Sequence, residues 1–294
     1  MQRKISLLVE TSALEPFLRQ LEQEDDRAAR RLAELLDPGT CHDWLWKINP
    51  RDGSRLSEED FIMCLASRLG AELTPGVESC CKLRGEVLDA AASHALCCAK
   101  AESTRGHYAV VAAVADGMVL ADAGLQTEVR GLVTTGERPA DILTTGALPG
   151  TKTALDITIA SQDAIHAGLD ACRSAYGRKM RNYSHLLPSL RRAGIIFQPM
   201  VWSAEGRPHP ATVRVMECTL QMVRRRRGLE VSTDLRARWQ HEIAVAIQRR
   251  KAAMMRACLP SSPLRQEWLA QGGAAGEAGD GNMLPPLDLD AGEQ

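Results

Sequence analysis

Between residues 105 and 207 the sequence alternates between helical and strand-like patterns, and this order limits the fold more than any other feature. The run "RGHYAVVAAVADGMVLADAG" predicts a helix that ends at Gly124. Three short β-prone runs follow, bounded by glycine or proline, then an amphipathic stretch over residues 162–193 that predicts a long helix, and then the β-prone run "IIFQPMVW". This order predicts an α/β fold with a mixed sheet flanked by helices.

Each of the three β-prone runs carries an acidic residue, namely Glu128 in "TEVRGLVT", Asp141 in "ADILTT" and Asp156 in "ALDITIAS". Alternation in the last run places Leu155 and Ile157 on one face of a strand and Asp156 on the other. A carboxylate there must be solvated, paired or bound to a metal, because burying an uncompensated charge is costly. Two carboxylates on adjacent strands can share Mg²⁺, which prefers oxygen ligands. The alternative is an ordinary half-exposed strand.

Capping signals predict a helical module over residues 1–75. Ser12 with Glu15 forms a capping box ahead of an apolar run with helical spacing, Ser57 begins a second helix, and Gly70 ends it. The tryptophans of "CHDWLWKINP", which lies between the two helices, are predicted to be packing anchors.

Residues 80–98, "CCKLRGEVLDAAASHALCC", concentrate four of the nine cysteines and a histidine in one short segment. Clustered Cys and His favour a zinc site, with Cys81, His94 and Cys98 as candidate ligands. Arg84 stands where a Cys-x-x-Cys pair would place its second thiolate, so one of the four ligands of a structural site is missing. The segment therefore predicts a degenerate CCHC-like zinc knuckle that binds Zn²⁺ weakly or has lost it. The alternative is a set of buried thiols that pack as small apolar side chains.

The charge is unevenly distributed, although the net charge is only −1. Residues 208–260 have helical periodicity and basic clusters, whereas residues 261–294 are glycine-rich and acidic, which predicts a disordered tail. Basic clusters suit the phosphate backbone of DNA, or of RNA, and the alternative is a solvated helix face. The main cluster is Arg224, Arg225, Arg226 and Arg227.

The N-terminal run "MQRKISLLVE" is too short for a secretory segment, and nine cysteines without such a segment predict a reducing compartment. We therefore expect a nuclear or cytoplasmic protein that is not secreted. The most apolar run contains Asp116 and Asp122 and falls short of the roughly 20 apolar residues of a membrane span, so no membrane association is expected.

From about residue 40 to residue 205 the chain resembles the C-terminal part of non-LTR retrotransposon polyproteins. The resemblance rests on the order of several weak motifs: the lead-in "WLWKINPRDGSRLSEEDFIMCLASRLG", the Cys/His segment, and "RGHY", "EVRGLV", "RPADI", "ALDITI" and "KMRNY". In that family a zinc knuckle precedes a restriction-like endonuclease of the PD-(D/E)xK class that nicks target DNA. No polymerase-type aromatic-x-Asp-Asp motif is present, so we expect a fragment or relic of such a polyprotein without its reverse transcriptase.

The resemblance implies a DNA endonuclease that depends on Mg²⁺ or Mn²⁺. It places Asp141 at the Pro-Asp position, Asp156 at the following acidic position, Lys179 as the helix-borne lysine and Glu128 as a third carboxylate. Thr158 stands where a simple D-x-K motif has its lysine, which is a departure that affects activity more than fold. The alternative is a non-catalytic nucleic-acid-binding or vestigial domain that keeps the nuclease fold.

Four further residues are candidate nucleic-acid contacts beside the arginine cluster. His107 is a candidate for orienting a phosphate or, alternatively, a helix cap, and Tyr183 falls at the tyrosine of the family's last motif. Arg105 and Arg138 are the two basic candidates. The predicted regions are a helical lead-in at 1–75, the knuckle at 76–104, a restriction-endonuclease-like α/β domain at 105–207, a basic helical region at 208–260 and the disordered tail at 261–294.

Overall fold

The structure is a computed structural model, and all of its described residues belong to the first of two compact units, residues 1–261. The predicted tail, Arg138 and the Ser12–Glu15 capping box lie outside the described residues. The described residues are 16, 19–20, 23, 26–47, 55–71, 73, 80–88, 92–129, 131–132, 139–164, 167–168 and 170–259.

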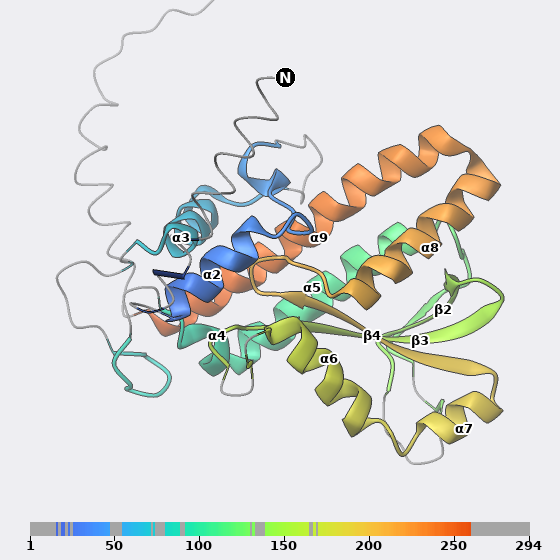
Figure 1. Ribbon diagram of the computed structural model, residues 1–294, viewed down its shortest axis with the longest axis horizontal. Coiled ribbons are helices and arrows are strands. Elements are labelled where there is room, and N and C mark those ends of the chain that lie inside the picture. The colour runs from blue at the N-terminus through green and yellow to red at the C-terminus, as the bar shows by residue number, and fades with distance from the viewer. Residues whose placement is uncertain are drawn as a thin grey trace, which may run out of the picture. The chain divides into compact units, whose positions relative to one another are not determined.

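A four-stranded open sheet forms the centre of the fold (Figure 1). Its strands are β1 (Gln126–Thr127), β2 (Ile142–Leu148), β3 (Thr151–Ala160) and β4 (Ile195–Ser203), in that order across the sheet. β2 is antiparallel to both β1 and β3, whereas β3 and β4 are parallel. The mixed sheet of an α/β fold that the sequence predicts is therefore confirmed.

The first predicted strand is shorter than its sequence suggests. β1 ends at Thr127 because the next residue, Glu128, has φ +52°, a left-handed conformation that interrupts an extended strand. Val129 and Leu132 are instead partly buried against the cluster that lies beneath α7. The apolar character of "TEVRGLVT" therefore reflects packing as well as strand pairing.

The long helix predicted over residues 162–193 is two helices, α6 (Ala171–Asn182) and α7 (Leu187–Arg192). Asp170 caps α6 by accepting the backbone N–H of Arg173 at 3.0 Å. Pro188 lies in the first turn of α7, where its missing N–H costs nothing. Apolar residues continue at helical spacing through the turn between them, so periodicity does not reveal the break.

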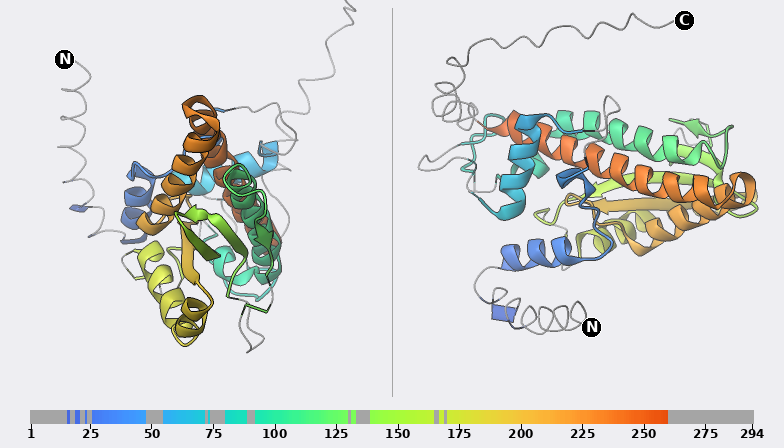
Figure 2. Two further views of the ribbon diagram at one scale, coloured as in Figure 1. Left: turned by 90° about the vertical axis from the view of Figure 1, so that its right-hand side faces the viewer. Right: turned by 90° about the horizontal axis from the view of Figure 1, so that it is seen from above.

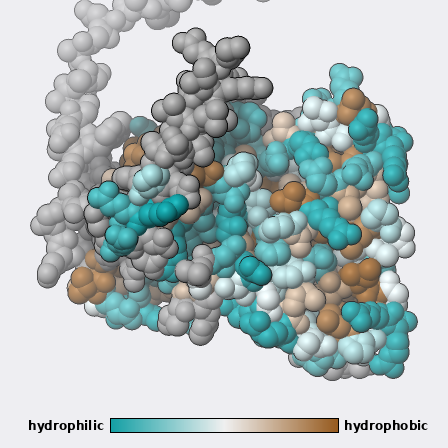
Figure 3. All heavy atoms as spheres, in the orientation of Figure 1, coloured by the Kyte–Doolittle hydropathy of each residue, from teal (hydrophilic) through white to brown (hydrophobic). Residues whose placement is uncertain are grey.

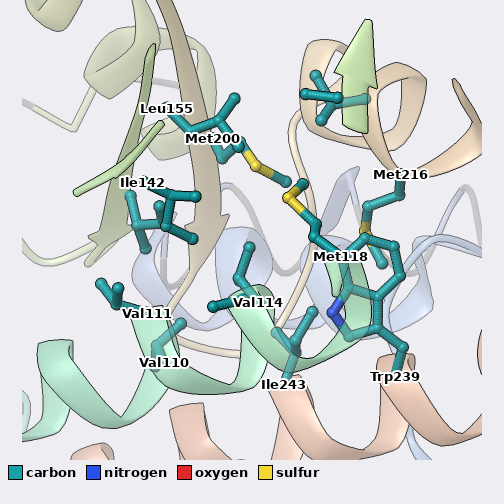
Figure 4. Packing of buried hydrophobic residues seen from close by; sticks show 14 of the residues in the cluster. Val110, Val111, Val114, Met118, Ile142, Leu155, Met200, Met216, Trp239 and Ile243 are labelled. Carbon is teal, nitrogen blue, oxygen red and sulfur yellow. The ribbon is translucent and has the colours of Figure 1, made fainter. Parts of the chain in front are cut away.

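Three helices cover the opposite face of the sheet from α6 and α7 (Figure 1). They are α5 (Lys100–Met118), α8 (Pro210–Arg227) and α9 (Leu229–Cys258), and α5 and α9 run side by side (Figure 2). One core joins these helices to the sheet, so the predicted regions 105–207 and 208–260 share a single hydrophobic interior. Figure 4 shows its centre: Val110, Val111, Val114, Met118, Ile142, Leu155, Met200, Met216, Trp239 and Ile243.

Beneath α6 and α7 the other face of the sheet carries two smaller apolar clusters. Ala154 belongs to the cluster under α7, and Ala160 belongs to the cluster under α6. Asp156 lies on the same side of β3 as both, because side chains alternate along a strand. Its carboxylate therefore stands between two apolar clusters.

The N-terminal part of the chain forms α2 (Asp26–Leu36), the short helix η1 (Asp43–Leu45) and α3 (Glu58–Leu69). The predicted cap of α3 is confirmed, since Ser57 Oγ accepts the backbone N–H of Asp60 at 3.2 Å. Its predicted end is confirmed as well, because Gly70 has φ +69°.

The two tryptophans near η1 behave differently. Trp44 is buried and packs edge-on against Phe61 of α3, with ring centroids 5.8 Å apart, as expected of an anchor. Trp46 is 62% exposed, so the anchor prediction is wrong for this residue. The residues that follow Trp46 and Lys47 are outside the described chain, up to Arg55.

Candidate active site at the sheet and a thiol cluster

Asp141 lies directly before β2 and is fixed by the neighbouring strand. Its backbone N–H donates to the carbonyl of Leu155 at 2.8 Å, and its Oδ2 accepts the backbone N–H of Ile157 at 2.7 Å. These two bonds flank Asp156 on β3, so the carboxyl groups of Asp141 and Asp156 come from adjacent positions on paired strands. The expectation that β2 and β3 each bring a carboxylate to one region of the sheet agrees with this register.

Asp156 is paired with Lys179, which reaches it from α6. The lysine Nζ donates to Asp156 Oδ1 at 3.0 Å and lies 2.9 Å from Oδ2, an oxygen that accepts no hydrogen bond from the described residues. The side chain of Asp156 is only 8% exposed, whereas that of Lys179 is 25% exposed. The half-exposed strand considered as an alternative is thus replaced by a buried carboxylate with an ion-pair partner.

Burial controls the protonation of Asp156. Loss of solvent raises the pKa of Asp156 above its ordinary value, and the nearby charge of Asp141 acts in the same direction. Lys179 and His107 lower the pKa, but not enough to reverse the effect of burial. The ionised form of Asp156 is therefore less favourable here than in water, even with Lys179 beside it.

His107 supplies the fourth side chain of the site. It lies near the N-terminal end of α5, and its Nε2 is 3.3 Å from Asp141 Oδ1. The sequence marked His107 as a candidate phosphate contact, whereas the structure places its ring against one of the candidate metal ligands. Asp141, Asp156, Lys179 and His107 together form what we call the carboxylate site.

Two other predicted residues border the carboxylate site. Glu128 lies opposite Asp141 on the β1 side, where its backbone N–H donates to the Asp141 carbonyl at 2.8 Å, while its side chain is exposed. Tyr183 follows α6, and its ring centroid lies 5.8 Å from Lys179 Nζ and 5.0 Å from the ring of Phe197. Tyr183 therefore packs beside the lysine that contacts Asp156.

Of the arginines predicted to bind nucleic acid, Arg105 and the cluster at 224–227 lie in the described part of the chain. Arg105 is exposed and pairs with Glu102 on the same turn of α5, with its Nε 3.1 Å from Glu102 Oε2. Arg138 is outside the described residues, so the structure does not place it.

The arginine cluster ends α8 and is exposed (Figure 3, where α8 meets α9). Arg226 donates to the carbonyl of Ala121, just past the C-terminal end of α5. His107 lies eleven residues before that helix end at Met118, which corresponds to about 16 Å of helix. The cluster therefore lies at the C-terminal end of α5, whereas the carboxylate site lies beside the middle of that helix.

A second group of chemically active side chains lies away from the sheet. The thiols of Cys81, Cys98 and Cys258 are buried and lie within 4.8 Å of one another, and the sulfurs of Cys81 and Cys98 are 3.6 Å apart. The structure thus brings together two of the three predicted zinc ligands. His94 is not in this group, and Cys258 was not among the candidates because it ends α9, far along the chain from the Cys/His segment.

The thiols differ in acidity. Burial raises the pKa of Cys258 to about 12, and hydrogen bonding and charge from Cys81 act in the same direction. Burial also acts to raise the pKa of Cys81, but hydrogen bonds from the backbone N–H groups of Leu83 and Arg84, together with those from the Cys258 and Cys98 thiols, outweigh it and lower the pKa to about 7. Cys81 is therefore the thiol of the cluster that ionises first.

Comparison with protein-family models and with curated proteins finds no match to this chain. None of the helices in the described part of the chain is both long enough and apolar enough to cross a membrane.

Proposed function

We propose that the carboxylate site belongs to a Mg²⁺- or Mn²⁺-dependent DNA endonuclease with a PD-(D/E)xK-like arrangement. The observation that carries the proposal is the position of Asp141 and Asp156 on adjacent strands, flanked by the hydrogen bonds to Leu155 and Ile157, with Lys179 at the same place. Oxygen ligands of this kind suit a hard divalent cation. The order of the sequence motifs supports DNA as the substrate and a retrotransposon polyprotein as the origin.

The residues of the site divide the chemistry among them. A bound divalent cation supplies a Lewis acid for the phosphate and lowers the pKa of a water nucleophile. Asp141 and Asp156 would hold that cation, with Lys179, which now lies 2.9 Å from Asp156 Oδ2, giving up part of its contact with the carboxylate. Lys179 stabilises the negative charge that develops on the phosphate in the transition state.

Two neighbouring side chains position these groups. His107 contacts Asp141 Oδ1, which fixes that carboxylate on the side away from its bond to Ile157. Tyr183 lies beside Lys179 and limits the directions in which the ammonium group moves when a phosphate competes with Asp156 for it. His107 and Tyr183 thus orient the reacting side chains and do not themselves take part in the reaction.

The alternative, a non-catalytic domain that keeps the fold, is favoured by one observation. Lys179 already pairs with Asp156, and Asp141 already accepts a backbone N–H, so the site is largely satisfied by protein groups alone. A relic that binds nucleic acid without cutting it would retain this arrangement.

A plasmid-nicking assay separates the two. The full chain is incubated with supercoiled DNA in Mg²⁺, in Mn²⁺ and in chelator, alongside Asp141→Asn, Asp156→Asn and the control Asp116→Asn, which alters an exposed carboxylate of α5. The proposal predicts metal-dependent nicking by the wild type and the control, and none by the two site variants. DNA binding without nicking in either metal supports the alternative, and equal nicking by all four proteins refutes the assignment of the site.

A further inference from the structure

The thiol cluster is built from two distant parts of the chain. Cys81 belongs to a tight turn, and Cys98 ends the short helix α4 (Ala95–Cys98), whereas Cys258 ends α9. The backbone N–H of Lys82 donates to the Cys258 carbonyl at 2.9 Å, which fastens the turn to the end of α9. All three thiols are buried, so their convergence is part of the interior and not a chance approach on the surface.

The distance between the sulfurs fits two thiols that share one metal ion better than a disulfide. Two thiolates that bind one tetrahedral zinc at about 2.3 Å lie about 3.8 Å apart, while the sulfurs of a disulfide are separated by about 2.05 Å. The observed separation of the Cys81 and Cys98 sulfurs is 3.6 Å, and Cys258 completes a group within 4.8 Å.

The turn at Cys81 is shaped to hold a thiolate. Its carbonyl accepts the backbone N–H groups of Arg84 and Gly85, at 3.3 and 2.7 Å, and Gly85 has φ +72°, a conformation that favours glycine. This turn directs backbone N–H groups of Leu83 and Arg84 toward the Cys81 sulfur. Hydrogen bonds of this type stabilise the thiolate that a metal requires.

His94 lies outside the 4.8 Å group of thiols, so its side chain must move toward the sulfurs to complete the site, but its two ring nitrogens have the surroundings of a ligating histidine. Its Nδ1 lies 3.1 Å from Glu86 Oε2, and its Nε2 is buried without a hydrogen-bond partner among the described residues. Zinc-binding histidines commonly give one ring nitrogen to a carboxylate and the other to the metal. His94 also precedes Cys98 by four residues, which places both on one face of the α4 turn.

We propose that Cys258 is a zinc ligand, and that Cys81, Cys98, Cys258 and His94 form a Cys₃His zinc site that links the Cys/His segment to the end of α9. The sequence predicted weak or lost zinc because Arg84 occupies the place of one ligand. Cys258 fills that vacancy from the other end of the described chain, so the reason for expecting weak binding no longer applies.

The charges of the site agree with this assignment. Three thiolates, one neutral imidazole and Zn²⁺ leave a net charge of −1, which is costly to bury without a counter-charge. Arg84 lies in the turn that begins at Cys81, and its guanidinium is 4.0 Å from Glu86, the carboxylate that contacts His94. The arginine in the place of the missing ligand therefore offsets the charge of the site.

The zinc proposal does not rest on the proposed nuclease activity, so its test uses metal content and spectroscopy. The full chain is purified under reducing conditions as the wild type, as Cys258→Ser and as Cys97→Ser. Cys97 is a matched control because it adjoins Cys98 but is exposed and outside the cluster. Zinc is measured by metal analysis, and Co²⁺ is substituted to record thiolate charge-transfer and tetrahedral ligand-field bands.

We expect one zinc per chain and identical Co²⁺ spectra in the wild type and in Cys97→Ser. Cys258→Ser is expected to bind zinc at least about 10-fold more weakly and to lose about one third of the charge-transfer intensity, because one of three thiolates is removed. Unchanged zinc affinity and spectrum in Cys258→Ser would overturn the proposal, as would a metal-free wild type that gives no thiolate band with Co²⁺.

X-ray absorption of the zinc-loaded wild type decides the matter even if Cys258→Ser does not fold. Three sulfur ligands and one nitrogen support the site as proposed. Two sulfur ligands would overturn the three-thiolate site, and a Cys81–Cys98 disulfide in the metal-free protein, identified by peptide mapping, would overturn the metal site altogether.

Discussion

Substitution of Gly117 tests the packing of α5 against α9, two helices of the main hydrophobic core. A Cβ at this position would lie 2.1 Å from Cε2 and Nε1 of Trp239, where ordinary contacts are near 3.4 Å or longer. Trp239 is fully buried, and its indole N–H donates to the Ala113 carbonyl at 3.0 Å. Gly117→Ala must therefore displace a large buried ring, and the displacement breaks the hydrogen bond of its indole N–H.

The expected cost follows from these contacts. Overpacking a well-filled core costs about 1–3 kcal/mol, and leaving the buried indole N–H unpaired costs about 1–3 kcal/mol more. Alanine recovers at most about 1 kcal/mol through its higher helix propensity. Gly117→Ala should thus reduce the free energy of unfolding by about 3 kcal/mol, which corresponds to a fall in Tm of about 6–12 °C for a domain of this size.

Gly177→Ala provides the matched control. Gly177 is also helical, in α6, but its added Cβ would meet only the end of the flexible Arg181 side chain, at 3.3 Å. This variant should be neutral or more stable by about 0.5–1 kcal/mol. Urea unfolding followed by tryptophan fluorescence measures both changes. If Gly117→Ala is as stable as the control, the α5–α9 packing described above is refuted.

Three further predictions concern charge. Burial raises the pKa of Asp156 despite its lysine partner, so Asp156→Asn should be as stable as the wild type or more stable in metal-free buffer at neutral pH. Mn²⁺ at 100 times its Kd should stabilise the wild type by roughly 2.7 kcal/mol but should not stabilise this variant. An equal shift in Tm in both proteins contradicts this. Burial acts to raise the pKa of Asp170, but Arg207 and backbone N–H groups lower it overall, so its stabilisation is present above about pH 4 and is lost as the pH falls through the lowered value. Asp170→Asn, which retains capping ability, should therefore be less stable than the wild type at pH 7, and the difference should shrink as the pH falls below about 4, as melts over this range will show. If the end of α8 binds DNA, Arg224→Glu with Arg225→Glu should reduce the slope of log affinity against log salt by about 2, and an unchanged slope identifies a solvated face.

Local signals in the sequence predicted the elements that depend on local chemistry. The Ser57 cap and the Gly70 end of α3 were found because both use residue types with specific backbone preferences. The strands β2, β3 and β4 were found because apolar runs between turn residues are characteristic of buried strands. The periodicity over residues 162–193 missed the break between α6 and α7. Pro188 marks this break, because a proline inside a helical pattern favours the start of a new helix over the continuation of the old one.

The carboxylate site was partly predictable for the same reason. Consecutive strands joined by a tight turn pair with each other, so Asp141 and Asp156 were expected to be neighbours. Lys179 could be assigned only through the family resemblance, since nothing in its local sequence indicates which carboxylate it contacts. The pairing of His107 with Asp141, and of Cys258 with Cys81, depends on helices that meet only in the folded chain. No spacing rule within one sequence encodes such contacts.

The two sites are mechanically connected through α5. Cys98 lies just before α5 begins at Lys100, and His107 follows seven residues later, about 10 Å along the helix. Between them the side chain of Arg250 on α9 packs so closely on Gly106 that any Cβ would lie 2.4 Å from it. A zinc that joins Cys98 to Cys258 would hold the start of α5 against the end of α9. It would therefore fix the position from which His107 reaches Asp141, which gives the thiol cluster a structural role in the geometry of the carboxylate site.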